Sequence, residues 1–170
     1  MLSTRLSVLV LGASMLCAAC ESAPTGPSGA AAAGGFSPRL YTNGQYICAN
    51  QSVPSGYVIL SADRSPSCAF YSPTSYNMYY IGIPGSQENV CANSPIPSGY
   101  VITSGQGTAY CPSYSATGMN MYSIKIPGYE ETVCGNSPIP SGYTVVGYTS
   151  TSYCPNWSAI SNNAKYIRHV

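Results

Sequence analysis

The stretch CANSPIPSGY, from Cys91 to Tyr100, decides the fold because it occurs three times at one spacing. It returns 43 residues later as CGNSPIPSGY, residues 134–143, and 43 residues earlier as CANQSVPSGY, residues 48–57. A second cysteine follows the first by 20 residues in each case, at Cys68, Cys111 and Cys154. A fixed period of this length indicates tandem copies of one small structural unit. We therefore expect three units, residues 37–83, 84–126 and 127–170.

Each unit is expected to be all-β. β-Branched and aromatic residues follow each Pro-Ser-Gly turn, in residues 57–60, 100–103 and 143–146. Residues 78–83 and 121–126 alternate as a half-buried strand would, and Pro-Gly turns then lead into 89–91 and 132–134. A further short strand is expected to end at each second cysteine, as in residues 108–111. This predicts three or four short strands per unit and no helix outside the N-terminal segment.

The six regularly spaced cysteines predict disulfides. A unit of this size buries too little apolar surface to offset its backbone entropy, and closing a 20-residue loop contributes about 3 kcal/mol. The register favours pairing within each unit: Cys48–Cys68, Cys91–Cys111 and Cys134–Cys154. Six cysteines allow 15 connectivities, and one rival has similar symmetry, with Cys68–Cys91, Cys111–Cys134 and Cys48–Cys154.

Two arrangements of the units fit the repeat. One is a linear array in which each unit touches its neighbours, and the other is a closed, pseudo-threefold body such as a β-trefoil or β-prism. Residues 37–40 align with residues 80–83, so an N-terminal strand could either begin a stack or complete a ring. The low count of aliphatic residues argues against one large core and favours the array.

The N-terminus has the pattern of an export signal. Arg5 precedes an apolar stretch, residues 6–16, which is too short to span a bilayer and ends in Cys17-Ala18-Ala19-Cys20. This ending resembles the lipobox of bacterial lipoproteins, although Cys17 stands where an aliphatic residue is usual. The resemblance implies a signal peptide over residues 1–19 and a lipid on Cys20. The protein would be attached to a membrane through that lipid. The alternative is ordinary cleavage near Ala19 or Ala23, which would give a secreted protein.

Two further features accompany this resemblance. Residues 20–36 are rich in Pro, Gly, Ser and Ala and are expected to form a flexible tether. In lipoproteins of Gram-negative bacteria, a non-aspartate residue after the lipidated cysteine, here Glu21, goes with delivery to the outer membrane. The expected location is therefore the cell envelope.

The composition excludes several chemistries. Charged residues make up 6% of the chain and the net charge is +1, so the basic surface that nucleic acids need is missing. His169, the one histidine, lies next to the C-terminal residue and is expected to be a solvated tail residue. The carboxylates beyond the tether, Asp63, Glu88, Glu130 and Glu131, form no site that repeats. We expect no catalysis, no cofactor and no metal.

Aromatic residues recur in two registers. Tyr71, Tyr114 and Trp157 each stand three residues after a second cysteine, and Tyr57, Tyr100 and Tyr143 each open a strand. Such rings can stack on sugar faces, but they can equally cover a disulfide or form the core of a small β unit. We take the first register as the candidate ligand-binding set and expect the second to be structural. Asn50, Asn93 and Asn136 are expected to stabilise the turn after each cysteine through bonds to backbone.

These patterns favour a lipid-tethered binding or adhesion module. Its partner would be a glycan or another surface polymer, or else a protein of the envelope. The alternative is a structural spacer or envelope-assembly protein that has no small ligand and pairs through edge strands. An enzyme is the third and least supported hypothesis.

Overall fold

The computed structural model describes residues 43–116, 118–158 and 160–170. The predicted signal peptide, the lipid site at Cys20, the tether over 20–36 and the N-terminal strand considered at 37–40 lie outside the described residues. The account below therefore concerns the three repeated units.

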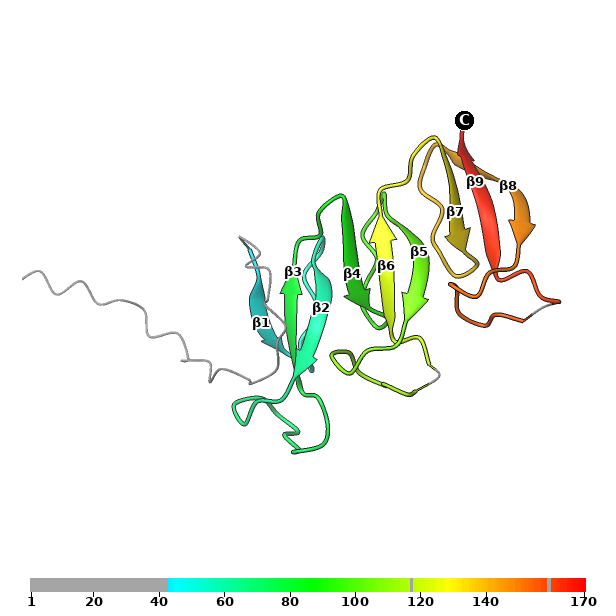
Figure 1. Ribbon diagram of the computed structural model, residues 1–170. Coiled ribbons are helices and arrows are strands. Elements are labelled where there is room, and N and C mark those ends of the chain that lie inside the picture. The colour runs from blue at the N-terminus through cyan, green and yellow to red at the C-terminus, as the bar shows by residue number, and fades with distance from the viewer. Residues whose placement is uncertain (1–42, 117, 159) are drawn as a thin grey trace, which may run out of the picture. The chain divides into compact units, whose positions relative to one another are not determined.

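Each unit is one three-stranded antiparallel sheet, and the third strand in sequence lies between the other two (Figure 1). The all-β prediction is confirmed, with no helix in the described ranges. The strands of the first sheet are β1 (Gln45–Cys48), β2 (Val58–Asp63) and β3 (Met78–Gly82). The second sheet contains β4 (Gln87–Cys91), β5 (Val101–Gln106) and β6 (Met121–Lys125). The third contains β7 (Glu130–Cys134), β8 (Tyr143–Thr149) and β9 (Ala164–His169).

The three units also share the same irregular backbone features, a turn glycine and a β-bulge. The Pro-Ser-Gly turns place Gly56, Gly99 and Gly142 at φ between 83° and 88°, which glycine adopts without steric cost. The second strand of every sheet then has a bulge at one register position, between Ile59 and Ser61, Ile102 and Ser104, or Val145 and Gly147. Bulges increase local twist and shift the register of a strand. The 43-residue spacing therefore repeats a three-dimensional unit in detail.

One predicted strand is wrong. Residues 108–111 form turns, and the equivalent residues before Cys68 and Cys154 do the same. Thr108 bonds to the Asn120 side chain and the Tyr110 carbonyl accepts the N–H of Ala62 from the first unit, so this stretch folds as turns and adds no strand to its own sheet. Each sheet therefore has three strands.

The three disulfides join the two cysteines of each unit: Cys48–Cys68, Cys91–Cys111 and Cys134–Cys154. This is the intra-unit pairing that the register favours. Each bridge connects the end of the first strand of a unit to the long connection between its second and third strands.

The apolar cores are shared between neighbouring units. Ile59 and Ile81 of the first unit pack with Cys91, Cys111 and Met121 of the second. In the same register, Ile102 and Ile124 of the second unit pack with Cys134, Cys154 and Ala164 of the third. The disulfide of one unit thus closes the core of the unit before it.

The units touch in chain order. Strand β2 contacts β4 and strand β5 contacts β7, whereas among the described residues no strand of the first sheet contacts one of the third. The contacts are those of an open array and not those of a closed threefold body. Small units that cannot complete a core alone gain stability from such nearest-neighbour interfaces.

Candidate ligand-binding loops

The candidate aromatics lie in the connection between the second and third strands of each unit. We call these connections the long loops: residues 64–77, 107–120 and 150–163. Figure 1 shows each long loop at the end of its own sheet opposite the end where the Pro-Gly turns, residues 84–85 and 127–128, leave the strands. Each loop contains the second cysteine of its unit, so a disulfide holds one point of it to the sheet.

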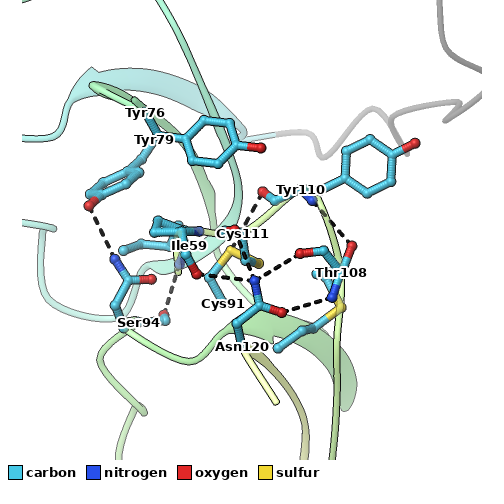
Figure 2. Close-up of a disulfide and its surroundings, with 12 residues drawn as sticks. Ile59, Tyr76, Tyr79, Cys91, Ser94, Thr108, Tyr110, Cys111 and Asn120 are labelled. Atoms are coloured by element: carbon cyan, nitrogen blue, oxygen red, sulfur yellow. Dashed lines mark hydrogen bonds between the residues drawn. A yellow bond between two sulfur atoms is a disulfide. The ribbon is translucent and has the colours of Figure 1, made fainter. Parts of the chain in front are cut away.

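A buried asparagine organises each long loop. The side-chain amide of Asn120 donates to the carbonyl oxygens of Thr108 (2.8 Å), Cys111 (2.9 Å) and Pro112 (3.1 Å). Its carbonyl oxygen accepts the backbone N–H of Thr108 at 2.8 Å. Figure 2 shows this amide between Thr108 and the Cys91–Cys111 disulfide. One side chain thereby satisfies backbone groups that have no partner in a strand.

The same arrangement recurs around Asn77 and Asn163, each of which donates to three loop carbonyls and accepts one backbone N–H. These asparagines are 4–8% exposed. The three asparagines share the 43-residue spacing, but nothing in the sequence shows that their side chains are buried. Their bonds, the same in every unit, hold the described part of each loop as a fixed platform.

The candidate residues are exposed on these platforms. Tyr71, Tyr114 and Trp157 are 50%, 57% and 54% exposed, and none of them belongs to a buried cluster. Covering a disulfide was the structural alternative for them, but Ile59 and Ile102 of the preceding unit pack on the second and third bridges. All three rings are about half-exposed to solvent.

The second aromatic register is structural. The hydroxyl of Tyr100 donates to the carbonyls of Pro84 (3.2 Å) and Gly85 (2.7 Å). Tyr143 does the same with Pro127 and Gly128, at 3.0 and 2.9 Å. These partly buried rings tie each Pro-Gly turn to the start of the second strand of the unit, β5 or β8.

The asparagine after each first cysteine does not act as predicted. Asn93 donates its side-chain amide to the hydroxyl of Tyr79 in the preceding unit, at 3.1 Å, and not to the backbone of its own turn. Asn50 and Asn136 are exposed. In the first unit the neighbouring Gln51 accepts the backbone N–H of Cys48 instead, at 3.1 Å.

Further apolar residues of the long loops are exposed that the sequence did not single out; Phe70 and Ile160 do not recur between units, and Tyr153 recurs only as Tyr110. Phe70 is 86% exposed, Tyr153 70% and Ile160 99%. Phe70 also has a φ of 59°, a left-handed conformation shared by its counterparts Ser113 and Asn156. Bulky residues rarely adopt this conformation.

Neighbouring loops meet. The hydroxyl of Tyr76, in the first long loop, donates to the carbonyl of Ala109 in the second. Arg64 lies over the Tyr76 ring, 4.8 Å from its centroid, and is the one charged residue in the three long loops. The first two long loops thus touch each other and carry a single charged residue.

The charged groups gather elsewhere. On the third sheet Glu130 pairs with Arg168 (2.6 Å), and Lys125 of the second unit pairs with Glu131 (2.5 Å). An open hollow of about 530 Å³ lies beside them, lined in part by Tyr166 and Val146. Its carboxylates are paired with cations, and no cluster of three or more metal-ligating side chains occurs in the described ranges.

His169 is exposed to solvent, as expected, but it belongs to a strand and not to a free tail. It ends strand β9, its backbone N–H donates to the carbonyl of Tyr129 at 2.9 Å, and its exposed ring meets Tyr143 edge-on at 5.1 Å. No carboxylate of the described residues bonds to it. The His169 ring therefore packs against Tyr143.

Comparisons of the chain with protein-family models, with curated proteins and with solved structures found no match. Among the residues that the structure describes, we find no helix with the length and hydropathy needed to cross a membrane. The long loops are therefore the described feature that bears most directly on function.

Proposed function

We propose that this chain is an exported, non-catalytic binding module of the cell envelope, attached to the membrane through lipid on Cys20. It engages a neutral glycan, or another polyhydroxylated surface polymer, through Tyr71, Tyr114 and Trp157. The observation that carries the proposal is the half-exposed state of these three rings at one position in every unit. Rings with an apolar face and a polar edge suit the faces and hydroxyls of sugars.

The rigidity of the loops supports this role. A disulfide and a buried asparagine hold each long loop before any ligand arrives. Binding therefore costs little further ordering of the loop backbone, which favours affinity from a small contact area. A loop that served only as a connection would not need four hydrogen bonds from one buried side chain.

The repetition supports a polymer as ligand. One exposed ring gives weak binding, but three on one chain bind a repeating polymer with raised effective concentration. The near absence of charge on the long loops favours an uncharged polymer over an acidic one.

Two features support the proposed location. The three disulfides are stable in an oxidising compartment outside the cytoplasm. The lipobox-like ending at Cys20 adds a specific means of attachment, and palmitate labelling of the chain and of a Cys20→Ser variant tests it. Labelling that is equal in the two would contradict the anchor.

The test of binding is a glycan-array screen of residues 36–170. The triple variant Tyr71→Ala/Tyr114→Ala/Trp157→Ala is compared with a control that removes three other exposed rings outside the long loops, Tyr46→Ala/Tyr129→Ala/Tyr166→Ala. Each lost ring contact costs about 0.5–1.5 kcal/mol, so the loop variant should bind roughly 10-fold or more weakly while the control binds normally. Binding that survives the loop variant contradicts the assignment of these residues. A folded chain that retains no glycan favours the structural-spacer alternative.

A further inference from the structure

The contact between neighbouring units follows a fixed pattern. The open edge of β2 directs the N–H groups of Ile59 and Ala62 at the second unit, where the Ser94 hydroxyl (2.8 Å) and the Tyr110 carbonyl (2.7 Å) accept them. Figure 2 shows Ile59 and Ser94 beside the Cys91–Cys111 disulfide. The next junction repeats both bonds at the same distances, from Ile102 to Ser137 and from Gly105 to Tyr153.

Apolar contacts complete this junction. Tyr79 and Tyr122, at one register, pack on the cluster that contains the next unit's disulfide. Val58 and Val101 are fully buried within the core cluster of the next unit. A small residue, Ala62 or Gly105, occupies the position whose backbone N–H donates to a carbonyl of the next unit at 2.7 Å. Docking thus needs an acceptor hydroxyl, an apolar ring, a buried valine and a small residue.

The outer face of the third unit departs from this pattern at three positions. Thr144 replaces the buried valine and is exposed, Tyr148 replaces the small residue and is 66% exposed, and Lys165 replaces the apolar ring. The N–H groups of Val145 and Tyr148, which correspond to the docked ones, bond to no such acceptor among the described residues.

Lys165 is committed to its own unit. Its ammonium group donates to the carbonyls of Gly135 (3.1 Å) and Ser137 (2.9 Å). Partial burial already lowers the pKa of Lys165 from its ordinary value. A further unit docked on this face would bury the ammonium group more completely, which is costly without a counter-charge.

The first unit departs from the pattern on its opposite face. Gln51 stands where Ser94 and Ser137 offer their hydroxyls, and its side-chain oxygen is occupied by the N–H of Cys48. The receiving face therefore lacks the side-chain hydroxyl that accepts a backbone N–H at both inner junctions.

We infer that these two outer faces are caps that prevent a second copy of this chain from docking head to tail, although the inner junctions join units of the same 43-residue repeat. Thr144, Tyr148 and Lys165 block one face, and Gln51 disables the other. Terminal units of repeat proteins need such faces to remain soluble, because an uncapped interface propagates. The chain is thereby kept monomeric while its inner units associate.

Sedimentation of the exported chain tests the inference. The unaltered protein should remain a monomer as its concentration rises. A variant with both faces restored, Gln51→Ser, Thr144→Val, Tyr148→Gly and Lys165→Tyr, should form chains whose mean mass rises with concentration. A variant restored at the third unit alone should stay monomeric, because the receiving face is still disabled. Chains formed by the unaltered protein, or a folded but monomeric double-faced variant, would overturn the inference.

A second variant decides the matter if the restored chain fails to fold. Val101→Thr/Tyr122→Lys places two cap residues at the inner junction between the second and third units. Hydrogen exchange at the N–H groups of Ile102 and Gly105 should then quicken at least 10-fold, while those of Ile59 and Ala62 keep their protection. Unchanged exchange at all four groups would contradict the docking pattern itself.

Discussion

The hydroxyl oxygen of Ser94 lies 2.8 Å from the backbone nitrogen of Ile59, 35 residues earlier in the chain, and this buried hydrogen bond joins two units. The equivalent bond from Ile102 to Ser137 has the same length. A serine that looks like part of a local turn motif is therefore a tertiary contact.

Replacing Ser94 with alanine leaves the N–H of Ile59 buried without an acceptor, which costs about 1–3 kcal/mol of the free energy of unfolding. Urea denaturation should show a lower midpoint with an unchanged slope. Ser98→Ala, in the same motif but exposed, is the control and should stay within about 0.5 kcal/mol. Equal midpoints for the two variants would mean that the junction does not depend on this bond.

Asn120→Asp should unsettle the second long loop. A carboxylate can accept the N–H of Thr108, but it cannot donate to the three carbonyls that the amide now satisfies, and we expect a loss of about 3 kcal/mol. Burial beside carbonyl oxygens raises the pKa of the new carboxyl group. The loss should therefore grow as the pH rises above about 3.9, where the unfolded chain ionises first.

Asn93→Asp is the matched control for that experiment. Asn93 is exposed, and a carboxylate there can accept the hydroxyl of Tyr79. Its urea midpoint should change little between acidic and neutral pH. A similar pH dependence in both variants would show that the buried amide is not what organises the loop.

The Cys48–Cys68 bridge should be the first to be reduced. All three bridges close loops of the same length, but Cys48 is half-buried and Cys68 is 7% exposed, whereas the other four cysteines are 0–1% exposed. A thiolate must reach a sulfur atom to exchange with it. Limiting reductant followed by alkylation and peptide mass spectrometry should label Cys48 and Cys68 several-fold faster. Preferential labelling of Cys91 and Cys111 would be evidence against the protection of each inner bridge by the preceding unit.

Phe70→Asn should stabilise the first unit by about 0.5–1 kcal/mol, because asparagine tolerates the left-handed backbone better than phenylalanine does. Asn156 already occupies this position in the third unit. Thermal unfolding is the measurement, and Tyr71→Asn is the control, since Tyr71 has no positive φ and should gain nothing. A fall in stability with Phe70→Asn would indicate that the exposed ring contributes packing that outweighs its backbone strain.

Much of the fold could be predicted from the sequence because the deciding patterns are local. The 43-residue period, the Pro-Ser-Gly and Pro-Gly turns and the alternating strands specify backbone within a few residues, and the regular cysteines constrain the pairing. The strand predicted at residues 108–111 is wrong because a distant side chain, Asn120, supplies the hydrogen bonds that a strand partner would otherwise provide.

The candidate site was less accessible to sequence reasoning. The spacing marked Tyr71, Tyr114 and Trp157, but it could not tell a ring that covers a disulfide from one that faces solvent. That distinction depends on which other residues reach the bridge, and Ile59 and Ile102 do so from the preceding units. Phe70 escaped notice because its exposure and its backbone conformation have no signature in a single sequence.

The sequence by itself determined that three disulfide-closed β units follow one another, because turns, strand periodicity and cysteine spacing act over short stretches of chain. Only the tertiary structure decided how the units share their cores, which asparagine is buried, which rings stay exposed and which outer faces are capped. The junctions depend on contacts between residues 35 positions apart, and the buried asparagines on bonds to residues 8 to 12 positions away. Burial of these groups is created by folding and is not written in any one segment.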